Sequence, residues 1–267
     1  MEADVEKTRH EVYKDNFVEY LLCLALDVGE GMLRNGGEIS RVEDTIERIC
    51  YAYGAEHVEV FSIISVINAS IRMPDGSYSA QMRRVRQTGM NLGVLERLNA
   101  LSREVCRERP ALDVFDSKLR ALKSRVVYRW WVTLVAMIAI SGCFTLFFGG
   151  TWRDALVAAF IGAVTSVFEI FKMKHINGMA KTAISSFVIA LIAGISVHLG
   201  MGENGGLIII GSIMILVPGL AFGTAMRDLL CGDLASGSLK TLQSILQALM
   251  IAFGYMLAVG IVGGAVI

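Results

Sequence analysis

The most chemically suggestive part of the sequence lies near its C-terminal end, between Pro218 and Gly237. Its small, polar and charged residues of interest are Pro218, Gly219, Thr224, Arg227, Asp228, Asp233 and Gly237. Because proline cannot donate a backbone hydrogen bond, a helix containing Pro218 should kink or break there and free carbonyl groups upstream. Broken helices beside a cavity are how many transporters bind their substrates.

The same residues also fit a purely structural interpretation. Proline and glycine are frequent in membrane helices, and Gly219 and Gly223 have the spacing of a small-residue packing face. Arg227 and Asp228 could then belong to a solvated turn. The residues alone leave both interpretations open.

Three acidic residues could carry a proton in or near an apolar environment: Asp228, Asp233 and Glu169. An acid close to hydrocarbon tends to have a raised pKa, and a carboxylate that can be neutralised can carry a coupled proton. Glu169 has a simpler alternative, which is an ion pair with Lys172 three residues further on.

We find no signature of an enzyme. The sequence lacks the H-E-x-x-H, G-x-S-x-G and P-loop motifs, and no G-x-G-x-x-G follows a predicted strand. The four histidines are scattered, and the five cysteines include no C-x-x-C pair, so a zinc site or a disulfide framework is not indicated. We therefore expect no catalytic centre, no metal site and no cofactor.

The elements that position these residues belong to two halves of very different charge. Residues 1–131 contain 19 Lys or Arg and 20 Asp or Glu, whereas residues 132–267 contain 6 and 5. The net charge of the whole chain is zero, which argues against a strongly basic nucleic-acid binder. The first half has the composition of a soluble domain and the second that of a membrane domain.

The second half contains five uncharged runs that predict transmembrane helices. They cover residues 130–152, 155–168, 182–202, 204–226 and 241–267. A helix needs about 20 apolar residues to cross the bilayer core, and runs this long exclude the short strands of a membrane barrel. The second run has only 14 residues, so its helix must continue through Glu169. We expect a multi-pass α-helical membrane domain over residues 131–267.

Basic residues beside these runs predict the orientation, because positively charged flanks stay in the cytoplasm. Lys and Arg precede the first run and separate the second from the third and the fourth from the fifth, while the other three flanks contain only Arg153. This alternation supports five spans in the cytoplasmic (inner) membrane, with the N-terminal domain in the cytoplasm and the C-terminus outside. An odd number of spans is typical of one half of an inverted-repeat transporter.

Residues 17–110 should form an α+β cytoplasmic domain after a polar tail, residues 1–16. Apolar residues spaced by three and four predict a helix over residues 17–34, which Asn35-Gly36-Gly37 ends. A second helix should follow up to Gly54, with Ser40 and Glu43 spaced as a capping box.

The next part of this domain changes its period to that of β-strands. Alternating or β-branched segments cover residues 57–60, 66–73 and 77–85, with Pro74-Asp75-Gly76 as a turn. This pattern predicts a small antiparallel meander, followed by a helix over residues 91–107.

Residues 111–130 should form an amphipathic helix that connects the two domains. Its apolar residues step by three and four from Leu112 to Val126, and basic residues occupy the other face. In one interpretation the apolar stripe packs on its own domain and the helix leads into the first span. In the other, the helix forms an oligomer seam or lies on anionic lipid.

Two segments, residues 32–46 and 218–237, resemble the threonine/serine exporter family, and so does the plan of a cytoplasmic domain before five spans. In that family a full transporter has a second set of spans, which is fused in one chain or supplied by a separate small membrane protein. This chain is similar to the larger member of the split form, which in bacteria has been linked to export of dicarboxylates such as succinate. The resemblance implies proton-driven secondary transport and places weight on Gly36, Glu38 and Arg41 as well as on the residues between Pro218 and Gly237.

These observations lead to two hypotheses of different classes. The first is an inner-membrane subunit that exports a threonine- or serine-type amino acid or a dicarboxylate, together with a small membrane partner or further copies of itself. In this hypothesis Arg227 meets a substrate carboxylate and Asp228 or Asp233 carries the proton. The second is a membrane-anchored sensor or regulatory module whose spans serve for anchoring and oligomerisation.

Overall fold

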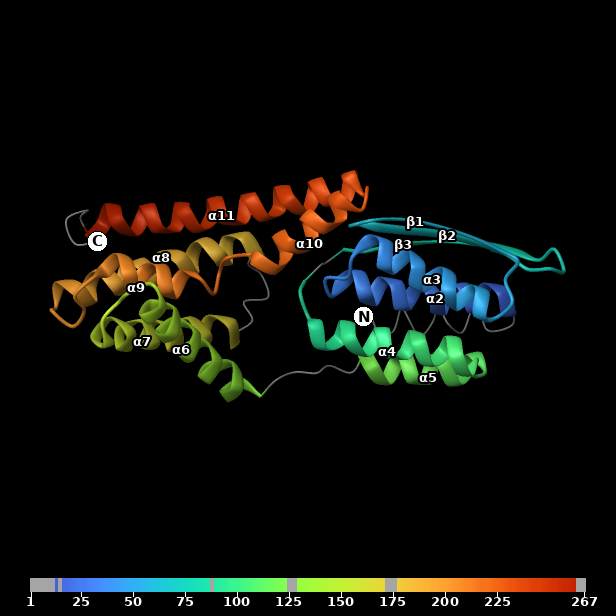
Figure 1. Cartoon of the computed structure of the whole chain (residues 1–267), viewed down its shortest axis with the longest axis horizontal. Coiled ribbons are helices and arrows are strands. Elements are labelled where there is room, and N and C mark those ends of the chain that lie inside the picture. Colours follow the sequence, from blue (N-terminus) through green and yellow to red (C-terminus); the bar gives the residue numbers. More distant parts are fainter. Residues whose placement is uncertain (1–12, 14–15, 87–88, 124–128, 171–176, 263–267) are drawn as a thin grey trace. The chain divides into compact units, whose positions relative to one another are not determined.

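A computed structural model describes residues 13, 16–86, 89–123, 129–170 and 177–262 (Figure 1). In this part of the chain the protein is mostly helical, with ten helices and one three-stranded sheet. The chain divides into two compact units, one of residues 1–126 with 220–241 and the other of residues 127–219 with 242–267. The segment 220–241 thus belongs to the same unit as the predicted cytoplasmic domain.

Helix α2 (Phe17–Arg34) is the central element of the first unit. The predicted bounds of this helix are confirmed, since the Asn16 side chain caps its start by accepting a hydrogen bond from the Val18 amide at 3.1 Å. Gly36 follows its end with φ +91°, a left-handed conformation that favours glycine. Most of the helix from Val18 to Gly29 is buried, because other elements cover it on several sides.

The predicted meander is confirmed as three antiparallel strands in the order β1-β2-β3: β1 (His57–Ile63), β2 (Val66–Arg72) and β3 (Tyr78–Arg84). The register places Phe61, Asn68 and Met82 side by side across the sheet. The opposite face contributes Val58, Ile67 and Ile71 to the core, where it packs on α2 and α3 (Ile39–Ala52). The sheet therefore has one apolar buried face and one face toward solvent.

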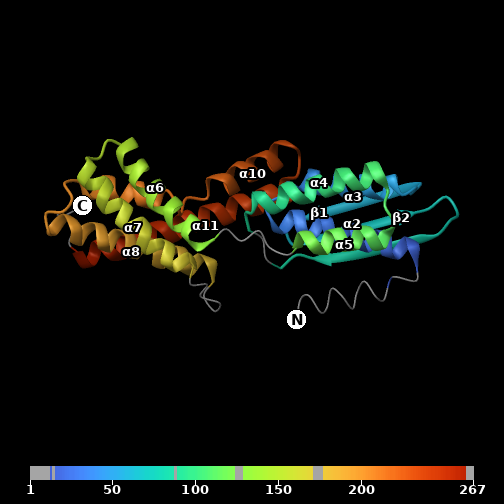
Figure 2. The ribbon, with the colours of Figure 1, turned by 90° about the horizontal axis from the view of Figure 1, so that it is seen from below.

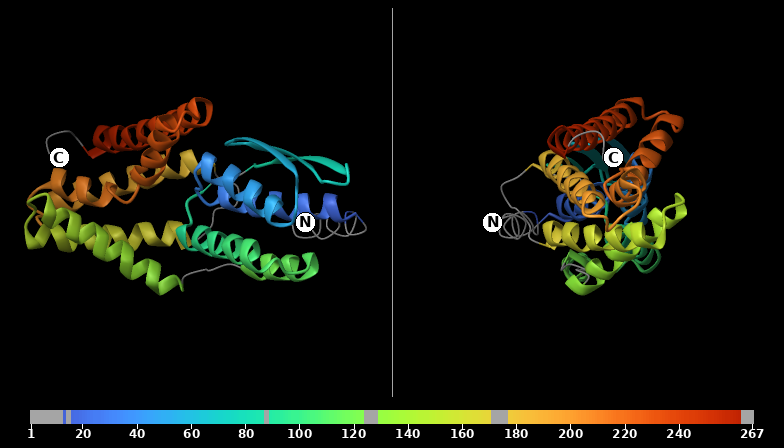
Figure 3. Two further views of the ribbon diagram at one scale, coloured as in Figure 1. Left: turned by 45° about the vertical axis from the view of Figure 1, so that its right-hand side comes forward. Right: turned by 90° about the vertical axis from the view of Figure 1, so that its left-hand side faces the viewer.

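Two further helices, α4 (Leu92–Glu108) and α5 (Leu112–Lys123), form a third layer on the other side of α2 and α3, and they run side by side (Figures 2 and 3). Leu112, Phe115 and Leu119 of α5 are buried in the core of this unit. The apolar stripe of the connecting helix thus packs on its own domain, whereas Val126 lies outside the described residues.

A buried ion pair joins helix α2 to the sheet. Arg83 of β3 lies 3.2 Å from Asp27 of α2, and both side chains are almost fully buried. The Arg83 guanidinium also contacts the Cys23 sulfur at 2.9 Å. Breaking such a buried pair from one side typically costs 3–5 kcal/mol, so this contact firmly fixes β3 on α2.

The second unit consists of α6 (Trp130–Phe147), α7 (Trp152–Ile170), α8 (Gly178–His198), α9 (Gly205–Ile213) and the part of α11 (Leu234–Val262) from residue 242 onward. Small residues allow these helices to approach closely. A Cβ atom added to Gly162 would lie 2.5 Å from the Met137 carbonyl oxygen, so only glycine fits between α6 and α7 there.

Among the described residues, three helices are long and apolar enough to cross a membrane: α6, α8 and α11. Helix α7 has 19 residues, but Arg153, Asp154 and Glu169 lie within it. The fourth predicted run is not one helix, because α9 ends at Ile213 and α10 (Gly219–Leu230) begins directly after Pro218. The helix break predicted at Pro218 is therefore confirmed.

Candidate functional site

Helices α10 and α11 form a tight hairpin that brings the predicted charged residues together. Gly232, between the helices, has φ +97°, so the chain reverses at a residue that accepts a left-handed conformation. A Cβ atom added to Gly237 would lie 2.8 Å from the Leu229 amide nitrogen. The predicted residue Gly237 thus permits the close approach of the two helices.

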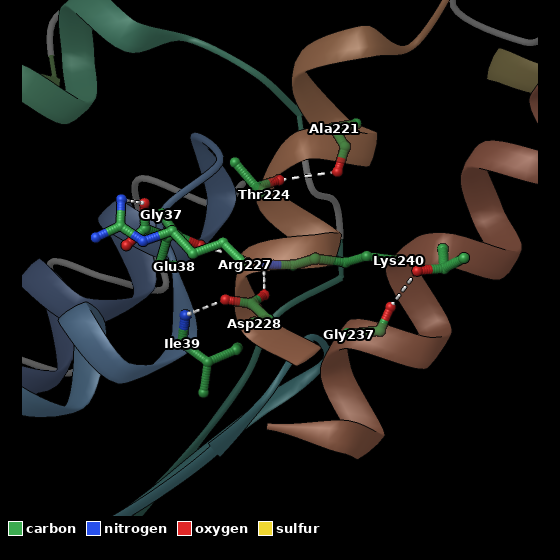
Figure 4. Close-up of polar contacts among 10 residues, drawn as sticks. Gly37, Glu38, Ile39, Ala221, Thr224, Arg227, Asp228, Gly237 and Lys240 are labelled. Atoms are coloured by element: carbon green, nitrogen blue, oxygen red, sulfur yellow. Dashed lines mark hydrogen bonds and ion pairs between the residues drawn. The ribbon is translucent and has the colours of Figure 1, made fainter. Parts of the chain in front are cut away.

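Asp228 of α10 is the buried centre of this cluster (Figure 4). One of its carboxylate oxygens accepts a hydrogen bond from Lys240 Nζ at 2.6 Å, and the other accepts one from the Ile39 amide at 3.4 Å. The side chains of Asp228 and Lys240 are only 1% and 12% exposed. Asp228 therefore links both helices of the hairpin to the start of α3.

Arg227 makes a second and more exposed ion pair with the same corner of the domain. Its Nη1 lies 2.8 Å from Glu38 Oε1, and the two side chains are 61% and 16% exposed. Lys240 Nζ also lies 3.4 Å from the Gly37 carbonyl oxygen. Two basic residues of the α10–α11 hairpin thus meet the loop between α2 and α3, as the close-up shows (Figure 4).

The predicted capping box of Ser40 and Glu43 is wrong. Helix α3 begins at Ile39, two residues earlier than a Ser40 N-cap requires, so Ser40 lies inside its first turn and Glu38 is the N-cap residue. Glu38 makes no side-chain cap hydrogen bond. The carboxylate of Asp228 accepts from the first free amide of α3 instead, as an acceptor at a helix N-terminus should.

Glu43 has a different role from the predicted one, because its carboxylate faces β1. Its Oε1 accepts hydrogen bonds from the Ser62 amide at 2.6 Å and the Ser62 hydroxyl at 3.0 Å. Burial raises the pKa of Glu43, and the hydrogen bonds from Ser62 only partly oppose that rise. The negative charge of Asp233 adds to it.

Asp233, in the turn before α11, is an acid of this cluster whose pKa is raised. Burial raises the pKa of this carboxyl, and the neighbouring charge of Asp228 raises it further, while Lys240 opposes both effects. The cluster therefore combines a carboxylate held by a lysine with a second carboxyl whose pKa lies above its ordinary value.

Other predicted site residues lie away from this cluster. The Thr224 hydroxyl donates to the Ala221 carbonyl within α10 at 2.9 Å, and Arg41 is exposed on α3. Within the described chain, a Cβ atom added to Gly219 or Gly223 would meet nothing within 4 Å, so these glycines are not a packing face inside it. The side chain of Glu169 and all of Lys172 lie outside the described residues.

Sequence reasoning missed the role of Lys240. This residue was one of the basic residues between the fourth and fifth uncharged runs that predicted the membrane orientation. Asp228 and Lys240 are 12 residues apart on two helices, so no helical spacing links them. It also missed Asp154, whose carboxylate accepts from the amides of Glu203 and Asn204 at 2.7 and 3.1 Å. Thr151 and Asp154 bond each other at the start of α7, and their spacing of three is a capping signal that could have revealed that contact.

Comparison with known proteins identifies the family. The model of the ThrE family, described as "Putative threonine/serine exporter", matches residues 23–262. The chain belongs to the threonine/serine exporter family. Membership makes it a membrane transporter and not an enzyme.

Two bacterial relatives of this transporter share the name "Probable succinate transporter subunit YjjP". The one from Klebsiella aerogenes is 25% identical over 232 residues, which cover 85% of this chain and 88% of the relative. The one from Escherichia coli is 23% identical over 245 residues, 90% and 94% of the two chains. An uncharacterized Schizosaccharomyces pombe protein is 24% identical over 65% of this chain, but over only 22% of its own length. No solved structure matches the chain.

Proposed function

We propose that this transporter is the larger subunit of a two-component exporter that moves small carboxylate-containing metabolites out of the cell. Threonine, serine and short dicarboxylates such as succinate are the substrate candidates, following the family description and the names of the bacterial relatives. The observation that carries the proposal is the charged cluster of Arg227, Asp228 and Lys240, which lies at the C-terminal end of α10 and in the first two turns of α11. A guanidinium matches a carboxylate, and the helix that presents it begins at the break at Pro218, a feature of many transporter binding sites.

Proton coupling would fall on Asp233 in preference to Asp228. Asp228 is engaged by Lys240 and by the Ile39 amide. Burial and the nearby Asp228 charge instead raise the pKa of Asp233. Asp233 would take up a proton at the cytoplasmic entrance, and the Asp228–Lys240 pair would sense that change of charge.

The membrane topology of the proposed exporter has five spans in the inner membrane, and α9 belongs to the fourth. The N-terminal domain would lie in the cytoplasm and the C-terminus outside, as the basic flanks predict. A small membrane protein would supply the second set of spans in the opposite orientation. The word "subunit" in the name of the bacterial relatives supports such a partner.

The test is reconstitution of the full chain in proteoliposomes, with and without the small membrane protein encoded beside it. Counterflow of labelled threonine, serine and succinate is then measured under an imposed pH gradient. We expect flux of at least one substrate only when both proteins are present. Flux by neither preparation, with folded protein in both, would contradict the exporter and favour the sensor hypothesis.

The coupling residue is tested in the same vesicles with Asp233→Asn. This substitution removes the proton site but keeps the size of the side chain, so accumulation driven by the pH gradient should be lost while substrate exchange continues at some rate. Asp44→Asn, at an exposed acid of α3, is the matched control and should leave driven accumulation intact. Undiminished accumulation by Asp233→Asn would remove Asp233 from the coupling mechanism.

A further inference from the structure

We infer that the Glu38 carboxylate is a built-in competitor of the substrate at Arg227, so that the protein in this state occupies its own carboxylate site. The inference rests on the proposed function and adds a regulatory residue from the cytoplasmic domain to it. The ligand class is a small metabolite with at least one free carboxylate.

The two ion pairs of the cluster differ in how easily they can be exchanged. Asp228 and Lys240 are buried, and a buried pair is costly to separate because each charge would be left without a partner. The guanidinium of Arg227 is 61% exposed, and exposed ion pairs contribute little because water and other ions compete with them. Arginine also has five N–H donors in a fork that matches a carboxylate. A free carboxylate can therefore replace Glu38 without disturbing the buried pair.

The surface next to Arg227 is open on one side. Gly223 precedes Arg227 by four residues on α10, so the two lie along one side of the helix. Within the described chain, no atom lies within 4 Å of a Cβ atom added to Gly223. The backbone beside the guanidinium is thus bare, and a short carboxylate can lie against it.

Glu38 can leave Arg227 without uncapping α3. An N-cap residue normally accepts from the first amides of its helix, and Glu is not among the residues preferred there. In this protein Glu38 makes no such bond, and Asp228 of α10 accepts from the Ile39 amide. The Ile39 amide therefore keeps its acceptor when the Glu38 side chain moves away, which a reversible competitor requires.

The decisive experiment compares Glu38→Gln with the unmodified protein, each co-reconstituted with its partner. Glutamine keeps the size of the side chain but removes the charge that competes with the substrate. We expect a KM for succinate or threonine that is about two- to fivefold lower, the equilibrium equivalent of losing an exposed ion pair. Asp44→Asn is the matched control, because it removes a 2.7 Å exposed pair with Arg48 on the same helix, and its KM should not change.

A binding measurement separates failure of this inference from failure of the proposed function. The thermal unfolding midpoint of the purified full chain is recorded against succinate concentration, with the uncharged diamide succinamide as the negative ligand. Half-maximal stabilisation at lower succinate in Glu38→Gln, and none by succinamide, would support competition even if no flux is found. If Glu38→Gln and the unmodified chain need the same succinate concentration for half-maximal stabilisation and have the same KM, the inference is overturned, even in a working exporter. Loss of the succinate response in Arg227→Gln would place the ligand at the guanidinium, and an unchanged response there would also overturn the inference.

Discussion

Two buried aspartates connect distant parts of this chain, and they are satisfied in opposite ways. Asp154, at the start of α7, accepts hydrogen bonds from the amides of Thr151, Glu203 and Asn204 and from the Thr151 hydroxyl. Asp228, on α10, accepts from a lysine and from a single amide. The first is held by neutral groups and the second mainly by a charge.

The difference indicates which of the two clusters can respond to ions. A network of amides around a carboxylate is insensitive to a passing ligand, because none of its donors is charged. Around Asp228 lie Arg227, Lys240, Glu38 and Asp233, and in the proposed mechanism their balance of charge changes when a carboxylate binds or a proton is taken up. We therefore interpret the Asp154 network as a fixed joint and the Asp228 cluster as the responsive one.

The largest effect on stability should come from removing one partner of the buried Asp228–Lys240 pair. Lys240→Met leaves Asp228 buried without its cation, which should lower the free energy of unfolding by about 3–5 kcal/mol. The measurement is the thermal unfolding midpoint of the full chain in detergent. Arg48→Met, which removes an exposed pair, is the control and should change stability by less than about 1 kcal/mol.

The double variant Lys240→Met with Asp228→Leu sharpens that result. Replacing both charges of a buried pair by apolar side chains is often neutral for stability, so most of the lost stability should return while transport stays impaired. Equal stability of the single and double variants would contradict the assignment of Asp228 and Lys240 as one unit.

Disrupting the network of neutral hydrogen-bond donors around Asp154 should have a smaller effect on stability. Asp154→Ala removes the acceptor of three amides and a hydroxyl, and each buried donor left without a partner costs about 1–3 kcal/mol, although water can satisfy some of them. We expect a total loss of roughly 2–4 kcal/mol, measured by the same unfolding midpoint. Asp154→Asn keeps one carbonyl oxygen and should lose about half as much; a loss equal to that of alanine would show that both oxygens are needed.

The exchangeable Glu38–Arg227 pair should matter less for stability than either buried aspartate, and most for the substrate. Glu38→Gln should lower the free energy of unfolding by less than about 1 kcal/mol, since the Arg227 side of the pair is exposed. A loss as large as that of Lys240→Met would mean that the Glu38–Arg227 pair is also a structural joint. Chemical denaturation of the full chain provides the comparison.

The smallest expected effect is a pH dependence at Glu43. Its pKa in the folded protein is raised above the ordinary value of 4.5, so the folded state binds more protons than the unfolded state between these two values. Stability at this site is therefore fully present below pH 4.5 and falls as the pH rises through the folded pKa. Glu43→Gln should flatten that part of the stability curve, and an identical curve for the variant would contradict the assignment.

The sequence by itself determined the elements of the N-terminal domain because their signals are local. Apolar spacing defined α2, alternation defined the three strands, and Pro218 marked the break before α10, each through the backbone chemistry of a few neighbouring residues. The candidate charges Arg227, Asp228 and Glu38 were also visible as residues. Their type and motif required no knowledge of what they contact.

Only the tertiary structure decided which of these charges meet. Glu38 and Arg227 are 189 residues apart, and Asp228 and Lys240 lie on opposite sides of a turn, so no periodicity connects them. The capping box failed for the same reason: a carboxylate from a distant helix accepts from the Ile39 amide, and Ser40 is left inside α3. Local patterns specify helices and strands, whereas the partners of a buried charge depend on which distant segment supplies the opposite charge or the free amide.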